Sequence, residues 1–197
     1  MELISQGAEA QIFRKDEQTL TKIRNPKTYR LDILDKEIRN FRTKREFKIL
    51  QTLSAKNVNV PKPFKIYEKE YMFDFEYLNG IMLKTILNEN LLFKAFDEII
   101  KMHNLNIIHY DLTTLNMINK DNKVYIIDFG LGVFSTKSEN KAEDLNLFFN
   151  CIKNEHAPFY HLKPQLEQVY IKNAIDGNNT IIKLRNIEKR GRNKNKQ

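Results

Sequence analysis

Two aspartates, each shortly after an apolar run, constrain the fold of this chain more than any other feature. Asp111 follows the run 107–108, and Asp128 follows the run 124–127. Asn116 stands five residues after Asp111, and a gap long enough for a short hairpin separates it from Asp128. Short apolar runs of this kind predict buried strands. The chain should therefore place the two aspartates at the ends of strands.

The segments 109–116 and 126–130 resemble the catalytic loop and the metal-binding motif of the kinase fold. Phosphoryl transfer needs a divalent metal to neutralise phosphate charge and a carboxylate to orient the attacking group. The resemblance implies ATP and Mg²⁺ as cofactors. Asp111 would be the catalytic base or water-positioning residue, and Asn116 and Asp128 would be magnesium ligands. The alternative is a set of ordinary turn residues, which the complete spacing disfavours.

Lys22 lies in a predicted strand, 19–24, where alternation places it on the same face as Leu20. In the kinase fold a lysine that faces the cleft from this strand binds phosphate, and a glutamate from the next helix holds it. Glu46 is the candidate for that glutamate. A surface lysine and a solvated glutamate are the alternative interpretation.

The turn between the first two predicted strands has the sequence Gly-Ala-Glu-Ala. It occupies the place of the glycine-rich phosphate loop, although it has a single glycine where kinases have three. The run 71–77 stands where the adenine-binding hinge belongs. Besides Lys22 and Glu46, the residues assigned to ATP binding are therefore Gly7, Ala8, Glu9, Ala10 and Glu76.

Hydrophobic periodicity changes from strands to helices along the chain. The predicted strands are 2–4, 11–15, 19–24, 64–67 and 71–77, with a helix over 38–53 between the third and the fourth. Beyond a turn at Asn79-Gly80 the predicted helices are 83–87, 91–103, 141–154 and 164–175.

This order predicts the α+β class and a minimal bilobal protein-kinase-like fold. We expect a small β-rich N-lobe over residues 1–78 and a short helical C-lobe over residues 79–182. Residues 183–197 would form a basic C-terminal tail.

Composition narrows the setting in which the chain works. The single cysteine, Cys151, excludes an internal disulfide framework and a cysteine-rich zinc site. The N-terminus lacks the pattern of a signal peptide, and no apolar run approaches the roughly 18 residues that a membrane helix needs. We expect a cytoplasmic protein without membrane contact.

The net charge of +8 is concentrated in two segments. Residues 14–48 carry twelve Lys or Arg against six Asp or Glu, and residues 183–197 carry seven against one. Two basic patches favour a polyanionic partner, and a solvated surface with a solubilising tail is the alternative. Basic residues without interleaved aromatic residues indicate phosphate contact rather than base reading.

Several further motifs make the resemblance more specific. In combination they resemble the atypical serine/threonine kinase/ATPase subunit of the KEOPS complex over nearly the whole chain. These motifs are the runs 7–10, 27–30, 42–46, 111–116, 128–132, 141–145 and 190–192.

The resemblance implies a kinase or ATPase that regulates the threonylcarbamoyl-transferase subunit of KEOPS. That assembly forms N6-threonylcarbamoyladenosine in tRNAs that read ANN codons. Other KEOPS subunits would be partners, and the basic tail would contact tRNA. The resemblance also implies that Asp144 is a buried helix residue that braces the catalytic loop. The chain departs from the family at Tyr110, where glycine is usual, and at Asn140 and Glu143.

Other functions remain open from the sequence. A small-molecule phosphotransferase of the aminoglycoside or choline kinase type shares the loop motifs but usually carries a large helical insertion. A RIO-type kinase is closer, although its extra N-terminal helical domain is not predicted here. A pseudokinase scaffold would lack the complete set of ATP-site residues. Only fifteen residues separate Asp128 from Asp144, which leaves little room to dock a peptide substrate.

Overall fold

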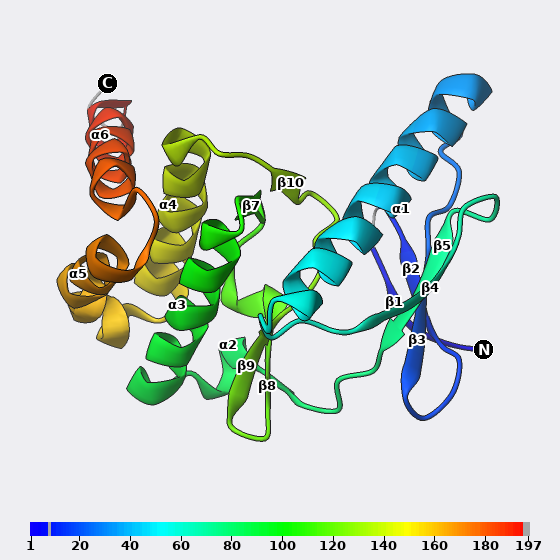
Figure 1. Ribbon diagram of the computed structural model, residues 1–197, viewed down its shortest axis with the longest axis horizontal. Coiled ribbons are helices and arrows are strands. Elements are labelled where there is room, and N and C mark those ends of the chain that lie inside the picture. Colours follow the sequence, from blue (N-terminus) through cyan, green and yellow to red (C-terminus); the bar gives the residue numbers. More distant parts are fainter. Residues whose placement is uncertain (8, 195–197) are drawn as a thin grey trace.

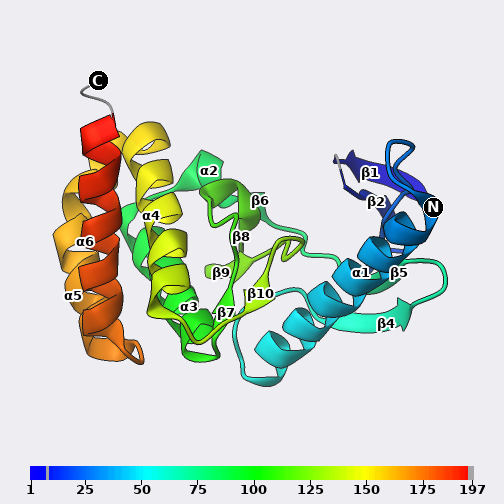
Figure 2. The same cartoon turned by 90° about the horizontal axis from the view of Figure 1, so that it is seen from above.

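The strand-rich and helix-rich halves of the chain form two lobes at opposite ends of the molecule (Figures 1 and 2). The computed structural model describes residues 1–7 and 9–194. The α+β class and the bilobal arrangement predicted from the sequence are confirmed. Within the described residues, no helix is both long enough and apolar enough to span a bilayer.

The N-lobe contains an antiparallel sheet in the strand order β1-β2-β3-β5-β4. Lys22 lies at the centre of this sheet, because β3 pairs with β2 on one side and with β5 on the other. Its strands are β1 (Glu2–Gln6), β2 (Gln11–Arg14), β3 (Thr19–Ile23), β4 (Pro63–Tyr67) and β5 (Met72–Glu76).

Helix α1 (Asp32–Ala55) packs against this sheet through its second half, where Phe47, Leu50 and Leu53 are buried as their spacing predicts. The helix begins six residues before the predicted start at Ile38. Its first turns bury charged side chains, Asp35 and Arg39, rather than apolar ones. An apolar-periodicity argument does not detect a helix face of that kind.

The C-lobe begins with a short strand and two helices and continues through the loop segments of the site. β10 pairs with β7, and β6, β8 and β9 form a small antiparallel sheet. The elements are β6 (Ile81–Met82), α2 (Leu83–Ile86), α3 (Glu89–Asn104), β7 (Ile107–Ile108), η1 (Thr114–Asn116), β8 (Met117–Lys120), β9 (Lys123–Ile126), β10 (Val133–Phe134), α4 (Ser138–Glu155), η2 (Ala157–Leu162), α5 (Lys163–Asn173) and α6 (Gly177–Lys194).

The two lobes are joined by a polar contact as well as by the chain. Glu98 of α3 is buried and accepts hydrogen bonds from the backbone amide of Asn59 at 2.8 Å and from its side-chain amide at 3.0 Å. The carbonyl of Asn59 accepts in turn from the amide of Ile126 at 2.9 Å. The loop that follows α1 is therefore fixed to the C-lobe beside β9.

Residues 183–197, which the sequence predicts to be a basic tail, begin inside helix α6. This helix was not predicted, because its many basic residues hide a short stripe of buried side chains. Thr180, Ile181 and Leu184 are fully or almost fully buried, and α6 lies along α4 in both ribbon views. Up to Lys194, residues 183–197 therefore continue the helical C-lobe instead of leaving it.

The centre of the C-lobe is a cluster of aromatic rings around Phe96, which has no exposed surface. The ring centroid of Phe96 lies 5.9 Å from that of Phe148, 5.8 Å from that of Phe149 and 6.1 Å from that of Tyr170. This cluster joins α3, α4 and α5.

Phe96→Ala should lower the free energy of unfolding by about 3–5 kcal/mol, because it removes a buried ring and leaves a cavity among three others. Urea unfolding followed by circular dichroism measures the change. Phe64→Ala is the control, since Phe64 is 52% exposed. Equal losses for the two variants would show that the cluster is not the core of this lobe.

Candidate active site

Two adjoining hollows between the lobes contain the predicted site residues. The first has a volume of about 250 Å³ and is lined by Lys22, Asp111, Asp128 and the turn after β1. The second has a volume of about 360 Å³ and is mainly apolar, with Leu20, Phe73 and Met82 among its lining residues. Lys22 and Asp128 line both, so the hollows adjoin at these two residues. The first suits phosphates and the second a purine ring.

Lys22 lies between two carboxylates. Its Nζ atom donates to Glu46 Oε1 at 2.7 Å and to Asp128 Oδ1 at 2.7 Å. Burial alone would lower the pKa of Lys22, but Glu46 and Asp128 hold that pKa above its usual value. Burial alone would raise the pKa of Asp128, but Lys22 holds it below. The lysine is therefore a cation and the aspartate an anion at neutral pH.

Arg24 is a site residue that the sequence reasoning missed. It is 3% exposed and donates to the second carboxylate oxygen of Glu46. Glu46 thus holds two cations, Lys22 of strand β3 and Arg24 directly after it, one on each oxygen. The signal was present in the sequence, because Arg24 stands two residues after Lys22 and so shares its face of the strand.

The β8–β9 hairpin explains how Asn116 and Asp128 come together. Asn116 directly precedes β8, and Asp128 is the second residue after β9. The strands are antiparallel, with Met117 opposite Ile126, so both residues lie at the same end. The side-chain nitrogen of Asn116 donates to the backbone and side-chain oxygens of Asp111, both at 2.8 Å. The amide oxygen of Asn116 is then the atom that could meet a cation.

Asp144 lies beneath the catalytic loop and is 1% exposed. Its carboxylate accepts from the backbone amides of His109 at 2.6 Å and Tyr110 at 2.7 Å. His103 Nε2 lies 3.3 Å from the same carboxylate, and His103 Nδ1 lies 2.8 Å from the hydroxyl of Tyr170. His103, near the end of α3, thus belongs to this brace.

His109 connects the two halves of the site. Its Nε2 lies 2.9 Å from the carbonyl oxygen of Ile127, and its Nδ1 accepts from the amide of Asp111 at 3.2 Å. The ring therefore carries its hydrogen on Nε2. It is fully buried and contacts Phe129 at a centroid distance of 4.7 Å. These contacts suit a packing role for His109 rather than a reactive one.

Tyr110 has a backbone φ of 61°. This left-handed conformation is common for glycine and costly for a bulky residue. The backbone needs this conformation because it turns here so that the amides of His109 and Tyr110 both donate to Asp144. A glycine at this position, which is usual in the family that the sequence resembles, would adopt the conformation without strain.

The remaining predicted residues have different surroundings. Gly7, Glu9 and Ala10 line the first hollow, and Glu76 lines the second. Ala8 lies outside the described residues. The carboxylate of Glu76 accepts from the backbone amide of Lys62 at 3.2 Å and lies 3.8 Å from Lys120 Nζ. The Glu76 side chain therefore supports the connection between the lobes.

Comparison with known proteins gives one matching family and close relatives. The RIO domain family model matches residues 8–158. The chain is 37% identical to the EKC/KEOPS complex subunit BUD32 of Enterocytozoon bieneusi, over 98% of each chain. It is 35% identical to a probable bifunctional tRNA threonylcarbamoyladenosine biosynthesis protein of Methanobrevibacter smithii. That match covers 96% of this chain and 36% of the relative, so the chain spans about a third of that longer protein.

Among solved structures the fold is similar to that of the Rio2 kinase from Chaetomium thermophilum, solved as an ADP/Mg²⁺-phosphoaspartate complex. The TM-score is 0.64 at 15% sequence identity, and the match covers 80% of this chain and 57% of the other. At this identity the likeness concerns the fold.

Tyr110→Gly should be more stable than Tyr110→Ala by about 1 kcal/mol. Both variants remove the ring, but only glycine removes the strain of the left-handed conformation, and part of that gain is offset in the unfolded chain. Chemical unfolding of the two variants side by side measures the difference. If alanine proves at least as stable as glycine, the backbone at this position carries no strain.

Proposed function

We propose that this chain is the Mg²⁺-ATP-dependent kinase/ATPase subunit of a KEOPS complex. The chain belongs to the RIO-domain family and, within it, to the Bud32 kinases. In this role it regulates the threonylcarbamoyl-transferase subunit during formation of N6-threonylcarbamoyladenosine in tRNAs that read ANN codons. The other KEOPS subunits are partners as well, and the assembly works in the cytoplasm. The relatives support this function and not a small-molecule phosphotransferase.

The observation that carries the proposal is the placement of Lys22 between Glu46 and Asp128, at a hollow that Asp111 also lines. A charged lysine held by two carboxylates is oriented to bind the phosphates of ATP. Asp111 is exposed at the mouth, and its backbone carbonyl is fixed by Asn116. Its proposed role is to orient a water molecule or a hydroxyl group for attack and to accept its proton.

The donor set also fits magnesium, which prefers oxygen ligands. The Asp128 carboxylate and the Asn116 amide oxygen are hard oxygen donors at the same end of the β8–β9 hairpin. When bound, Mg²⁺ would neutralise the charge that develops on the transferred phosphoryl group. The short link between Asp128 and α4 favours ATP hydrolysis coupled to a partner over phosphorylation of many peptides.

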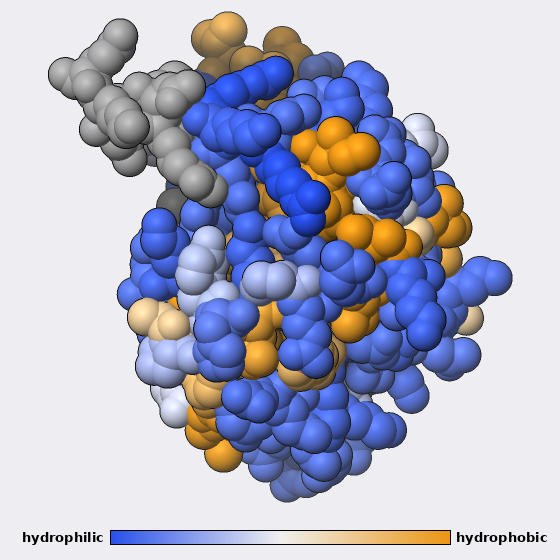
Figure 3. All heavy atoms as spheres, turned by 90° about the vertical axis from the view of Figure 1, so that its left-hand side faces the viewer, coloured by the Kyte–Doolittle hydropathy of each residue, from blue (hydrophilic) through white to orange (hydrophobic). Residues whose placement is uncertain are grey.

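Helix α6 is the proposed tRNA-facing element. Its buried stripe leaves Lys189 and Arg190 exposed, whereas Arg185 is occupied by Glu167 at 2.7 Å. The face made by the last helices is largely hydrophilic (Figure 3). Free basic side chains on a rigid helix contact phosphate without reading sequence.

Asp128→Ala should reduce Mg²⁺-ATP turnover by roughly 100-fold or more, because it removes a metal ligand and a partner of Lys22. Lys22→Ala should also reduce turnover strongly while the chain stays folded. Turnover is measured by phosphate release from the chain alone and after addition of the threonylcarbamoyl-transferase subunit and tRNA. For the wild-type chain we expect stimulation by both additions.

Asp97→Ala is the matched control, since Asp97 is an exposed carboxylate on α3 outside both hollows of the site. Unchanged turnover in Asp128→Ala would refute the assigned site. Negligible wild-type turnover under every condition would indicate a scaffold. High turnover that ignores the partner and tRNA would indicate another acceptor.

Lys189→Gln together with Arg190→Gln should weaken tRNA binding and reduce its salt dependence. Each lost phosphate contact changes the slope of log affinity against log salt by roughly 0.7–0.9. Deleting residues 183–197 is a poorer test, because it removes the buried Leu184. Binding to labelled tRNA at several salt concentrations gives the slope.

The control variant is Lys69→Gln with Lys123→Gln, which removes two exposed charges, one in the turn between β4 and β5 and one at the start of β9. Its slope should match that of the wild-type chain. If the α6 variant keeps the wild-type slope, this helix does not contact tRNA.

A further inference from the structure

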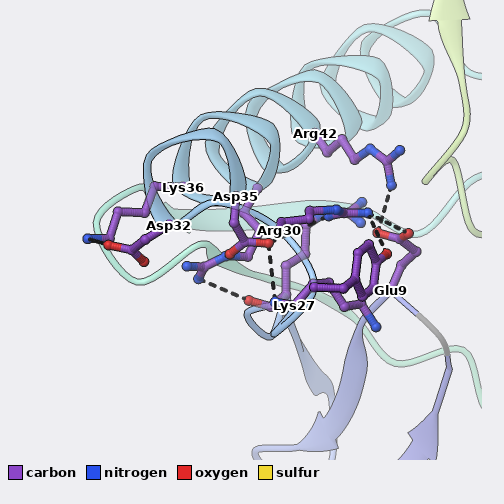
Figure 4. A network of polar contacts seen from close by, with 10 residues as sticks. Glu9, Lys27, Arg30, Asp32, Asp35, Lys36 and Arg42 are labelled. Atoms are coloured by element: carbon purple, nitrogen blue, oxygen red, sulfur yellow. Dashed lines mark hydrogen bonds and ion pairs between the residues drawn. The ribbon is translucent and has the colours of Figure 1, made fainter.

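Helix α1 carries two charged side chains on one face, Arg42 and Glu46, four residues apart. Glu46 holds Lys22 of β3 and Arg24, the residue that follows β3. Arg42 reaches in the same direction and donates from Nη1 to Glu9 Oε2 at 2.7 Å (Figure 4). One helix therefore holds both the phosphate-binding lysine and the segment that enters β2.

Glu9 has a second cation within reach. Arg30 Nη2 lies 3.4 Å from Glu9 Oε1, and Arg30 Nη1 lies 3.6 Å from Asp35 in the first turn of α1. Burial alone would raise the pKa of Glu9, but Arg42 and Arg30 together hold that pKa below its usual value. Both cations that bind Glu9 are thus anchored on α1 or on the loop just before it (Figure 4).

The contact lies at the phosphate end of the cleft. Glu9 and Arg42 line the first hollow together with Lys22, Asp111 and Asp128. Glycines with positive φ, which shape a phosphate loop in other nucleotide-binding proteins, are absent among the described residues. Among the described residues of this turn, the amide of Gly7 donates to the carbonyl of Ala10 at 2.9 Å. The position of the turn relative to α1 then depends on side chains.

We infer that Glu9 and Arg42 form a clasp that sets the distance between β2 and helix α1, and that they are positioning residues for the phosphates of the nucleotide. This inference rests on the proposed function and extends it. In a glycine-rich loop, backbone geometry holds the loop in position. Here the ion pair of the clasp holds the turn before β2 in position instead. Because Arg42 and Glu46 share one helix face, a displacement of α1 would release the clasp and Lys22 together.

A different role for Arg42 makes the opposite prediction. If Arg42 bound phosphate directly and Glu9 competed with phosphate for it, removing the charge of Glu9 would strengthen ATP binding. In a clasp, removing either charge weakens ATP binding, and removing both does no further harm. The sign of the Glu9 effect and its coupling to Arg42 separate the two roles.

The experiment compares Glu9→Gln, Arg42→Gln and the double variant with the wild-type chain. Glu68→Gln is the matched control, because Glu68 pairs with Lys44 of the same helix at the same 2.7 Å away from the cleft. The first measurement is amide hydrogen exchange in β1 and the start of β2 without nucleotide. The second is the affinity for Mg²⁺-ATP and for adenosine.

We expect faster exchange in this segment for both single variants. Affinity for Mg²⁺-ATP should fall roughly 3- to 10-fold, with adenosine affinity unchanged and the double variant no weaker than either single one. The Glu68→Gln control should resemble the wild-type chain in both measurements. A purely structural loss would weaken adenosine and ATP alike.

Unchanged exchange in both single variants, tighter ATP binding by Glu9→Gln, or additive losses in the double variant would each overturn the clasp. A wild-type chain that binds no nucleotide would refute the proposed function, and with it the phosphate-positioning role. Failure of the clasp alone would leave wild-type ATP binding intact, so the two failures are distinguishable.

Discussion

The carboxylate of Glu46 is the contact on which the arrangement of the N-lobe depends. Glu46 is 2% exposed, and its carboxylate is shared by Lys22 and Arg24, which are 6% and 3% exposed. Charges removed from water are tolerated when they are paired and are costly when a partner is lost. Such a cluster adds little to stability, but it ties α1 to Lys22 and Arg24. The ion pairs therefore set the position of α1 at the cleft, and the apolar side chains of α1 pack around these ion pairs.

The C-lobe has a counterpart in Asp144. This second buried carboxylate accepts the amides of His109 and Tyr110 and so fixes the backbone that leads to Asp111. Each lobe thus holds its part of the site with one buried anion. Lys22, bound to Asp128 as well as to Glu46, joins the two halves. The strain accepted at Tyr110 follows from this design, since the loop must turn sharply for two successive amides to face one carboxylate.

The sequence predicted the parts of the structure that have a local signal. Asp111, Asn116 and Asp128 were recognisable because strand ends and a hairpin dictate their spacing. The burial of Phe47 and Leu50 was recognisable because their spacing of three residues places them on one face of a helix. The start of α1 and the whole of α6 were missed. Their buried faces contain Asp35, Arg39 and Thr180, and a polar residue reveals its burial only through a partner far away in the chain.

Side-chain partners explain the other omissions. Arg24, Arg42 and His103 each depend on a residue more than twenty positions away, which no periodicity shows. These residues nevertheless have one feature in common. Each is a long polar side chain that joins its own segment to a residue of a separate segment. In the N-lobe, α1 carries three side chains that hold neighbouring segments, namely Asp35, Arg42 and Glu46. A partner that moves α1 would therefore act on Lys22 and on Glu9 at once, without touching the nucleotide.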